Sequence, residues 1–411
     1  MLHRRHLLLG AAAAPLLARP ALAQATREIA IGALYPMSGA SAQIGVDARH
    51  AMETAVAVVN ESHDIELPLA RGTGINGARL RLVIADHQAD PQKGRAEAER
   101  LITQEKVAAL VGSFHSAVTV TASVTAERYG VPFLAADSSS PSLHKRNLKF
   151  FFRPAAHDEM FTAAMFDFLD ARRKGGDRIE TVALVHEDTI FGTDSSAVQR
   201  RMATERGYRV LADVKYRANS PSMTSEVQQL KSADADVLMP SSYTTDAILL
   251  LRTMGELGYQ PKNIIAQAAG FAEQALYDAV GDRATGAISR GAFSLDLAAK
   301  RPSVGAVNAL FKARSGKDLN DNTSRQFMGM LLMAEAVARA GSTEGAKIRD
   351  ALAATNIPGE QTIMPWRRVA YGPDGQNVEA DPVLLQWLDG RFQTIYPETA
   401  AIRAARWPMR G

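Results

Sequence analysis

Hydroxyl-bearing residues gather in two turns, each between an apolar run and a helical stretch. Residues 107–111 form an apolar run without alternation, typical of a strand covered on both faces, and Ser113 and Ser116 follow it. A second run leads into the serines at 138–140. Because helix starts carry free N–H groups and a partial positive charge, two of them on adjacent strands predict a site for a small carboxylate. The same serines can instead serve only as helix N-caps, and the pattern leaves both interpretations open.

Enzyme and metal chemistry find little support in the other residues. The chain has no cysteine, which excludes thiolate ligands and Cys nucleophiles, and its histidines do not show the spacing of a helical zinc site. His115 stands beside Ser116, but neighbours in a turn usually point apart, so we interpret His115 as a loop histidine lining a pocket. The glycines of 72–77 match a dinucleotide fingerprint, yet a strand follows them where one should precede. We therefore expect no cofactor, no metal and no catalytic residue.

Strands and helices alternate along the chain and position these turns. A break near 152–157 divides the alternation into two series. The predicted strands of the two series cover 29–34, 80–85, 108–112 and 132–135, then 181–186, 209–215, 237–240 and 263–267. This βαβα order predicts an α/β fold with parallel sheets in two doubly wound lobes. Ligands of such sheets bind beyond the carboxyl ends of the strands, which is where the serine turns lie.

Two aromatic residues follow strands of the second series. Phe191 comes shortly after the strand at 181–186, and Tyr243 comes after the strand at 237–240. Aromatic side chains at such strand ends can cover the apolar part of a ligand. They can equally fill the crevice between two lobes as packing, and both interpretations stay open.

The first 23 residues have the features of an export signal. Arg4 and Arg5 precede an apolar run, and a small-residue motif ends at Ala23, so we predict a cleaved, twin-arginine-like signal peptide at 1–23. An ordinary secretory signal is the alternative. No cysteine follows the cleavage motif, so we expect a periplasmic protein without a lipid anchor. The chain has 47 basic and 44 acidic residues, and three of the basic residues are arginines of the leader. The remaining charges therefore balance, which argues against a nucleic-acid partner.

Motifs spread over most of the chain carry a family resemblance. They include IAIGALYPMSGASAQIG at 29–45, VGSFHSAVT at 111–119, YGVPFLAADSSSP at 129–141, FFRPAAHDE at 151–159 and VALVHEDTIFG at 182–192. In this order they resemble the leucine/isoleucine/valine-binding type of periplasmic solute-binding protein, the type I periplasmic binding protein family of ABC importers. The resemblance implies two Rossmann-like lobes joined by a three-segment hinge. It also implies a cleft that closes on a small-molecule solute, and docking of a monomer on the membrane permease of an importer.

The implied hinge sets the expected lobe boundaries and the expected function. We expect lobe 1 to comprise 27–155 plus 293–378, and lobe 2 to comprise 156–292 plus 379–411. The expected function is that of an ABC-importer receptor that binds a small carboxylate-bearing solute, a branched-chain amino acid or similar, between its lobes and has no enzymatic activity. A ligand-sensing subunit with the same fold is the alternative. A periplasmic hydrolase would need a nucleophile–base pair or a metal, and neither is visible.

The resemblance also implies roles for residues that match the family's motifs. Ser116 and Ser139 fall where the family holds a ligand carboxylate, and Asp137 falls where it uses main-chain atoms of a small residue. Asp158 matches an acid that faces the amine side of the ligand. The expected ligand-binding residues are thus Ser116, Ser139, Asp137, His115 and Asp158, the aromatic positions Phe191 and Tyr243, and Ile44 in place of an aromatic cover.

One departure from the family pattern concerns the ligand's amine. The amino-acid binders of this family place a Glu in a second-lobe turn to pair with the ligand ammonium, and here Ala268 takes that position. An unpaired buried ammonium would cost several kcal/mol. Either Asp137 and Asp158 replace the missing acid, or the ligand is an amine-free aromatic or aliphatic carboxylate or an amide.

Overall fold

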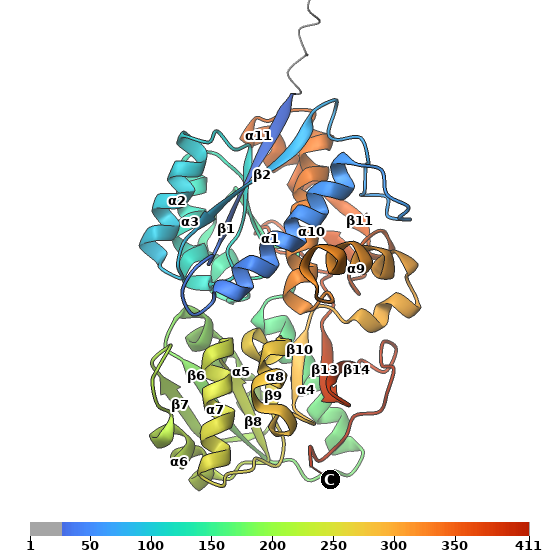
Figure 1. The fold of residues 1–411 in the computed structure, drawn as a ribbon. Helices are drawn as coiled ribbons and strands as arrows, with labels where there is room; N and C mark the ends of the chain where they lie inside the picture. Colours follow the sequence, from blue (N-terminus) through green and yellow to red (C-terminus); the bar gives the residue numbers. More distant parts are fainter. Residues whose placement is uncertain (1–26, 411) are drawn as a thin grey trace, which may run out of the picture.

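The computed structural model describes residues 27–410. Residues 28–152 contribute a parallel five-stranded sheet to the upper lobe of Figure 1. The strand order is β2-β1-β3-β4-β5. The strands are β1 (Glu28–Tyr35), β2 (Arg79–Asp86), β3 (Ala109–Gly112), β4 (Phe133–Ala135) and β5 (Phe151–Phe152). The predicted signal peptide, residues 1–23, lies outside the described residues.

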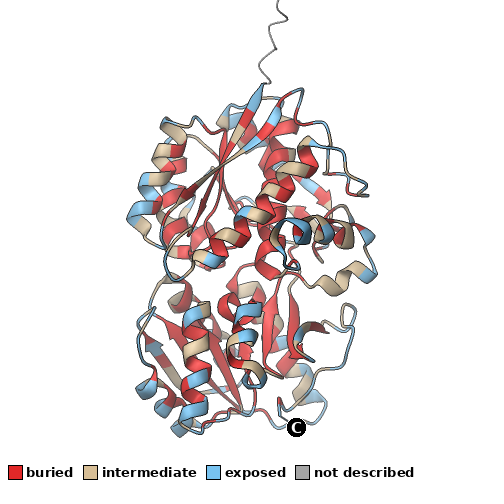
Figure 2. Cartoon of the chain, in the orientation of Figure 1, coloured by how far each residue is buried: buried red, intermediate tan, exposed pale blue. Residues whose placement is uncertain are grey.

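Helices cover both faces of this sheet, which explains the unbroken apolar runs of its strands. One face packs on α2 (Pro91–Thr103) and α3 (Ser116–Arg128). The other packs on α1 (Ala42–Asn60) and on three helices from late in the chain, namely α9 (Pro302–Ser315), α10 (Asp321–Ala340) and α11 (Gly345–Ala353). Figure 2 shows buried residues along these strands and on the inner sides of the helices. The short strands β11 (Asn356–Pro358) and β12 (Arg368–Ala370) pair with each other beside this lobe.

The lower lobe contains the second sheet. Parallel strands run in the order β7-β6-β8, and a bridge between Leu238 and Ile264 continues them into β9, β10, β13 and β14. The strands are β6 (Thr181–Glu187), β7 (Arg209–Tyr216), β8 (Val237–Ser241), β9 (Ile265–Ala266), β10 (Ile288–Gly291), β13 (Val383–Leu388) and β14 (Arg391–Tyr396). One face packs on α4 (Asp158–Lys174) and α5 (Ile190–Glu205), and the other on α6 (Thr224–Ala233), α7 (Thr244–Glu256) and α8 (Gln274–Val280).

The chain crosses between the lobes three times, after β5, after β10 and after β12 (Figure 1). The first and third crossings are hydrogen-bonded to each other. The Arg153 N–H donates to the Gly375 carbonyl at 2.8 Å, and the Asn377 N–H donates to the Arg153 carbonyl at 2.9 Å. The predicted fold class is therefore confirmed, while the predicted boundaries at 155/156, 292/293 and 378/379 stay predictions.

Short 3₁₀ helices complete the set of elements. They lie at Pro141–Arg146, Ala269–Ala272, Gly281–Arg283, Leu295–Ala299 and Gly359–Gln361. Among the helices within residues 27–410, none combines the length and apolarity that spanning a bilayer requires.

Candidate ligand-binding cleft

The two serine turns lie side by side at the carboxyl ends of β3 and β4. Gly112 at the end of β3 pairs with Ala135 at the end of β4, so the turns leave the sheet at the same level. Ser116 is the first residue of α3, and its hydroxyl accepts from the Ser140 N–H at 3.5 Å. Ser116 and Ser139 line a cavity between the lobes. The structure therefore brings together the two hydroxyls that were predicted to hold a carboxylate.

Other hydroxyls in the same turns are used within the first lobe. The Ser113 and Thr119 hydroxyls lie 2.9 Å apart, and those of Thr119 and Ser138 lie 2.6 Å apart. All three residues are buried, so this chain of hydroxyls ties the two turns together. The two serine turns thus combine structural bonding with groups that face the cavity.

Asp137 lines the cavity, but its carboxylate is already occupied. It accepts from the Phe114 N–H at 3.0 Å, from the Gln326 amide at 2.8 Å and from the Tyr35 hydroxyl at 3.4 Å. Burial raises the pKa of the Asp137 carboxyl above its ordinary value. The role of Asp137 in this arrangement is to hold Phe114 and Gln326, which leaves little of its carboxylate for a ligand ammonium.

Asp158 lies on the second-lobe side of the cleft, and both of its carboxylate oxygens accept hydrogen bonds. Its carboxylate accepts from the Ser195 hydroxyl and from the Gln267 amide, each at 2.8 Å. Its N–H donates to the Ser139 carbonyl across the cleft at 2.9 Å. The residues that line the cavity do not include Asp158, and they do not include Ile44, which is buried in the first-lobe core on α1.

Aromatic side chains from both lobes meet over the cavity. The Tyr243 ring centroid lies 5.2 Å from that of Phe191, 5.6 Å from that of Phe114 and 4.8 Å from that of His115. Burial, with a smaller contribution from the nearby His87, lowers the pKa of His115 to about 3, so its ring is neutral at physiological pH. Phe191 and Tyr243 line the cavity, and His115 lies beside Tyr243. Their contact with a ligand stays a prediction.

The second-lobe turn that matches the family's acid-bearing turn contains two strained alanines. Ala268 and Ala269 have φ values of 51° and 49°, a region that residues with a Cβ rarely adopt. Gly270 follows them, and a Cβ at this position would lie 2.6 Å from the Thr244 backbone. The next acid, Glu273, is buried and accepts from the side-chain amides of Asn320 and Asn322. This turn therefore presents apolar atoms to the cavity, since Ala269 lines it.

Sequence reasoning missed several residues that line the cavity. They are Phe114, Ala269, Arg290, Asn322 and Arg325. Arg325 donates to the Asp321 carboxylate and to the Asp137 carbonyl, each at 2.7 Å. Burial lowers the pKa of Arg290 to about 10, so this guanidinium stays charged at neutral pH. No strand was predicted around Arg290, because residues 288–291 show neither an apolar run nor alternation.

The cavity is small in this arrangement of the lobes. About 10 Å³ of it is open to the centre of a water molecule, which is room for about one water. Direct contacts join the two lobes around it, among them a hydrogen bond from the Ser140 hydroxyl to Asp194 and the bonds from Asn320 and Asn322 to Glu273. A solute of amino-acid size therefore needs the lobes to separate, at least in part.

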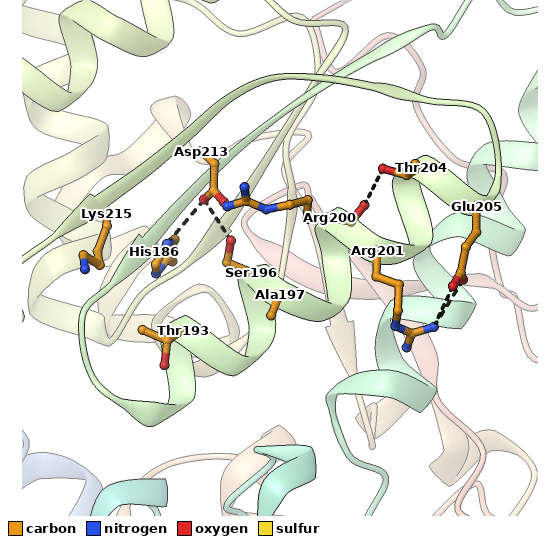
Figure 3. Close-up of a pocket in the computed structure, with 10 residues that line it drawn as sticks. All are labelled: His186, Thr193, Ser196, Ala197, Arg200, Arg201, Thr204, Glu205, Asp213 and Lys215. Atoms are coloured by element: carbon orange, nitrogen blue, oxygen red, sulfur yellow. Dashed lines mark hydrogen bonds and ion pairs between the residues drawn. The ribbon is translucent and has the colours of Figure 1, made fainter.

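A wider groove lies on the outer side of the second lobe, between α5 and the β6–β7 strands (Figure 3). Its volume is about 760 Å³. The Asp213 carboxylate accepts from the Ser196 hydroxyl at 2.8 Å, lies 3.3 Å from the His186 ring and pairs with Arg200. The polar groups of this open groove thus bind one another. Within residues 27–410, no three His, Asp or Glu side chains gather so that they could hold a metal ion.

The fold, with its buried cleft between two α/β lobes, is that of a two-lobed binding protein. A family model described as periplasmic binding protein matches residues 28–391, and the chain belongs to this family. A Leu/Ile/Val-binding protein homolog 8 from Brucella suis biovar 1 (strain 1330) is 30% identical over 412 residues, which cover 98% of each chain.

Solved structures agree with this fold. The leucine-binding protein LivK from Thermotoga maritima MSB8 superposes with a TM-score of 0.77 at 20% identity, over 89% of this chain and 97% of LivK. A solute-binding protein of an ABC transporter from Rhodopseudomonas palustris BisB5, in complex with 3,4-dihydroxybenzoic acid, has a TM-score of 0.75 at 18% identity, over 93% and 99% of the two chains. The predicted family is confirmed, and these relatives are described as binding proteins.

Proposed function

We propose that this protein is the extracytoplasmic solute receptor of an ABC importer and binds a small carboxylate-bearing solute between its lobes. The observation that carries the proposal is the pair of serine turns at the ends of β3 and β4, whose Ser116 and Ser139 line a cavity shared by both lobes. The Ser116 hydroxyl and the first N–H groups of α3 can donate to a carboxylate. Phe191 and Tyr243 would cover the apolar part of the solute.

Binding in this proposal proceeds by hinge closure. The solute enters while the lobes are apart, and the first lobe holds its carboxylate. The second lobe then closes and buries the remainder, because the ligand contacts both lobes only in the closed state. Asp137 and Asp158 act as positioning residues, since each binds the groups that shape the two walls. The closed protein would dock on the membrane permease as a monomer, after export and removal of residues 1–23.

Two classes of solute fit this proposal. Branched-chain amino acids are supported by the name of the Brucella relative and by LivK, a leucine-binding protein. Amine-free acids are supported by Ala268 and by the fold's occurrence in a complex with 3,4-dihydroxybenzoic acid. The second candidate function is that of a ligand-sensing subunit that uses the same cleft. Growth of a deletion strain on the identified solute separates the two, because loss of an import receptor would impair growth on that solute.

Substitution of Ser116 tests the site. We expect Ser116→Ala to weaken binding by about 1–3 kcal/mol, because a charge-assisted hydrogen bond to the carboxylate is lost. The solute is first found by a thermal-shift screen of amino acids, amine-free acids and amides, and affinity is then measured by calorimetry. Ser138→Ala is the matched control, since that buried hydroxyl bonds to Thr119 and does not line the cavity. Unchanged affinity of Ser116→Ala would overturn the site.

A further inference from the structure

Arg290 lines the cavity between the lobes, and contacts on several sides hold its guanidinium. It belongs to β10 of the second lobe, where it pairs with Leu384 of β13. Its side chain is 2% exposed, and its guanidinium carbon stacks 3.8 Å from the centroid of the Phe161 ring. The guanidinium reaches the first lobe, because Nη2 donates to the Ser139 hydroxyl at 3.4 Å. The hydroxyl of Ser139, which was predicted to bind a carboxylate, thus already contacts a cation of the second lobe.

The hydrogen-bonding capacity of Arg290 is largely unused. Its Nε and Nη1 are buried and have no hydrogen-bond partner among the described residues. The nearest carboxylate oxygen within ion-pair distance, on Asp321, lies 3.6 Å from Nη1. Asp321 is already engaged, since it accepts from Arg325 at 2.7 Å and from the Ala292 N–H at 2.5 Å. A guanidinium presents five donors in a planar fork, so Arg290 has donors left for an acceptor in the cavity.

The other buried arginines of the cleft and hinge differ from Arg290. Arg325 has bonds to Asp321, Asn322 and Asp137. Arg153 in the first crossing segment donates to the Ser138 and Ser140 carbonyls and to Gln376. Burying a cation without partners is costly, and proteins rarely do so outside functional sites. The unused donors therefore mark Arg290 as the group that a ligand would satisfy.

Resting on the function proposed above, we propose that Arg290 binds the ligand carboxylate from the second lobe, opposite Ser116 and Ser139. One carboxylate would then contact both lobes, so the negative charge itself would favour closure. The site accordingly selects amine-free carboxylic acids with an aromatic or aliphatic body. This inference adds Arg290 to the predicted site, and of the two ligand classes named above it favours the amine-free acids.

The charges around the cavity support the exclusion of an ammonium group. Both cations that line the cavity, Arg290 and Arg325, would repel it. The acids that might attract it are engaged, because Asp137 accepts three hydrogen bonds and Asp158 accepts two. The remaining wall is formed by Phe114, Phe191, Tyr243 and Ala269, which suits an apolar body.

Matched pairs of ligands test the class. Calorimetry on the mature protein compares 4-methylpentanoate with leucine, 3-phenylpropanoate with phenylalanine, and 4-methylpentanamide as the uncharged form. Of the two amine-free acids, we expect the one with the higher affinity to bind at least about 10-fold more tightly than the corresponding amino acid. We expect 4-methylpentanamide to bind more weakly than 4-methylpentanoate. An amino acid that binds as tightly as its amine-free partner overturns the inference and leaves the proposed receptor function intact. Failure of every acid to bind overturns both.

Variants of Arg290 test the residue. With the best acid, we expect Arg290→Gln to lose about 30-fold or more in affinity and Arg290→Lys to recover part of it, since lysine keeps the charge but not the fork. Arg200→Gln in the outer groove is the matched control, and its affinity should stay unchanged. Affinity of Arg290→Gln within about 3-fold of the unsubstituted protein, at a similar melting midpoint, overturns the inference. If Arg290→Gln does not fold, Arg290→Lys and the ligand pairs decide.

Discussion

The two walls of the cleft differ in how completely their polar groups are bonded. In the first lobe, Ser113, Thr119 and Ser138 bond to one another, and Asp137 accepts three hydrogen bonds. In the second lobe, Arg290 keeps unpaired donors, and the hydroxyls of Ser241 and Ser242 are buried without a partner among the described residues. The first lobe also has two buried atoms without a partner among the described residues, His115 Nδ1 and Gln326 Oε1, so the walls differ in kind of group: only the second keeps a charged group with unpaired donors. In the function proposed above, the second lobe would therefore select the ligand's chemistry, and the first would hold its carboxylate.

Substitution of the fully bonded arginine should have the largest effect on stability. We expect Arg325→Gln to lower the free energy of unfolding by about 3–5 kcal/mol, because Asp321 would lose its closest cation in a buried site. Arg290→Gln should cost far less, since that guanidinium is poorly bonded. Urea unfolding followed by circular dichroism compares the two variants. Equal losses of stability in the two variants would contradict the conclusion that Arg325 is well bonded and Arg290 poorly bonded.

The contact between the walls at Glu273 should respond to pH. Burial raises the pKa of the Glu273 carboxyl to about 7, with further effects from Asn322, Asp47, Asp321 and Lys317. A raised pKa of an acid means that protonation stabilises the structure, fully below about pH 4.5, and that this stabilisation is lost as the pH rises to about 7. We expect the unsubstituted protein to lose up to about 3 kcal/mol relative to Glu273→Gln over this window.

Melting midpoints at several pH values between 4.5 and 7.5 measure this loss. Asp278→Asn is the control, because Asp278 is an exposed acid on the helix that follows Glu273. Its pH profile should match that of the unsubstituted protein. If Glu273→Gln shows the same decline with pH as the unsubstituted protein, then Glu273 is not the titrating contact between the walls.

Substitution of Ile44 should have the smallest effect on stability, and it tests whether this residue belongs to the first wall of the cleft. This residue was predicted to cover the ligand, but it is 7% exposed and packs in the first-lobe core. We expect Ile44→Val to lower the stability by about 0.5–1.5 kcal/mol, as for loss of one buried methyl group, with ligand affinity unchanged. Calorimetry and urea unfolding on the same variant separate the two roles. A clear change in affinity with unchanged stability would return Ile44 to the ligand site.

The first wall was largely predictable because its signals are local. A strand, a hydroxyl-rich turn and a helix start occupy fewer than about 15 consecutive residues, which matches the length over which turn and capping chemistry acts. Ser116 accordingly starts α3, and Ser116 and Ser139 both line the cavity, while their binding of a carboxylate stays a prediction. The pattern could not show that Ser138, next to Ser139, turns instead toward Thr119, because that depends on how two strands align.

The second wall was predicted less well because its main residue lies on an unpredicted strand. β10 has four residues, Ile288–Gly291, with Ser289 and Arg290 in the middle, so it shows neither an apolar run nor alternation. It becomes a strand by pairing with β9 and with β13, and β13 arrives almost 100 residues later. A pairing of this kind leaves no mark in the local sequence.

By itself, the sequence determined the repeated strand–helix order, the two-lobed fold, the position of the serine turns and the aromatic residues above the cleft. These follow from burial patterns and turn chemistry within short stretches. The tertiary structure alone decided which polar groups are bonded and which are free. Asp137 is bound by Gln326, 189 residues away, and Asp158 by Gln267, 109 residues away, while Arg290 meets Ser139 across 151 residues. A buried polar group is satisfied or left open only when such distant segments come together, because its partners must lie within about 3 Å.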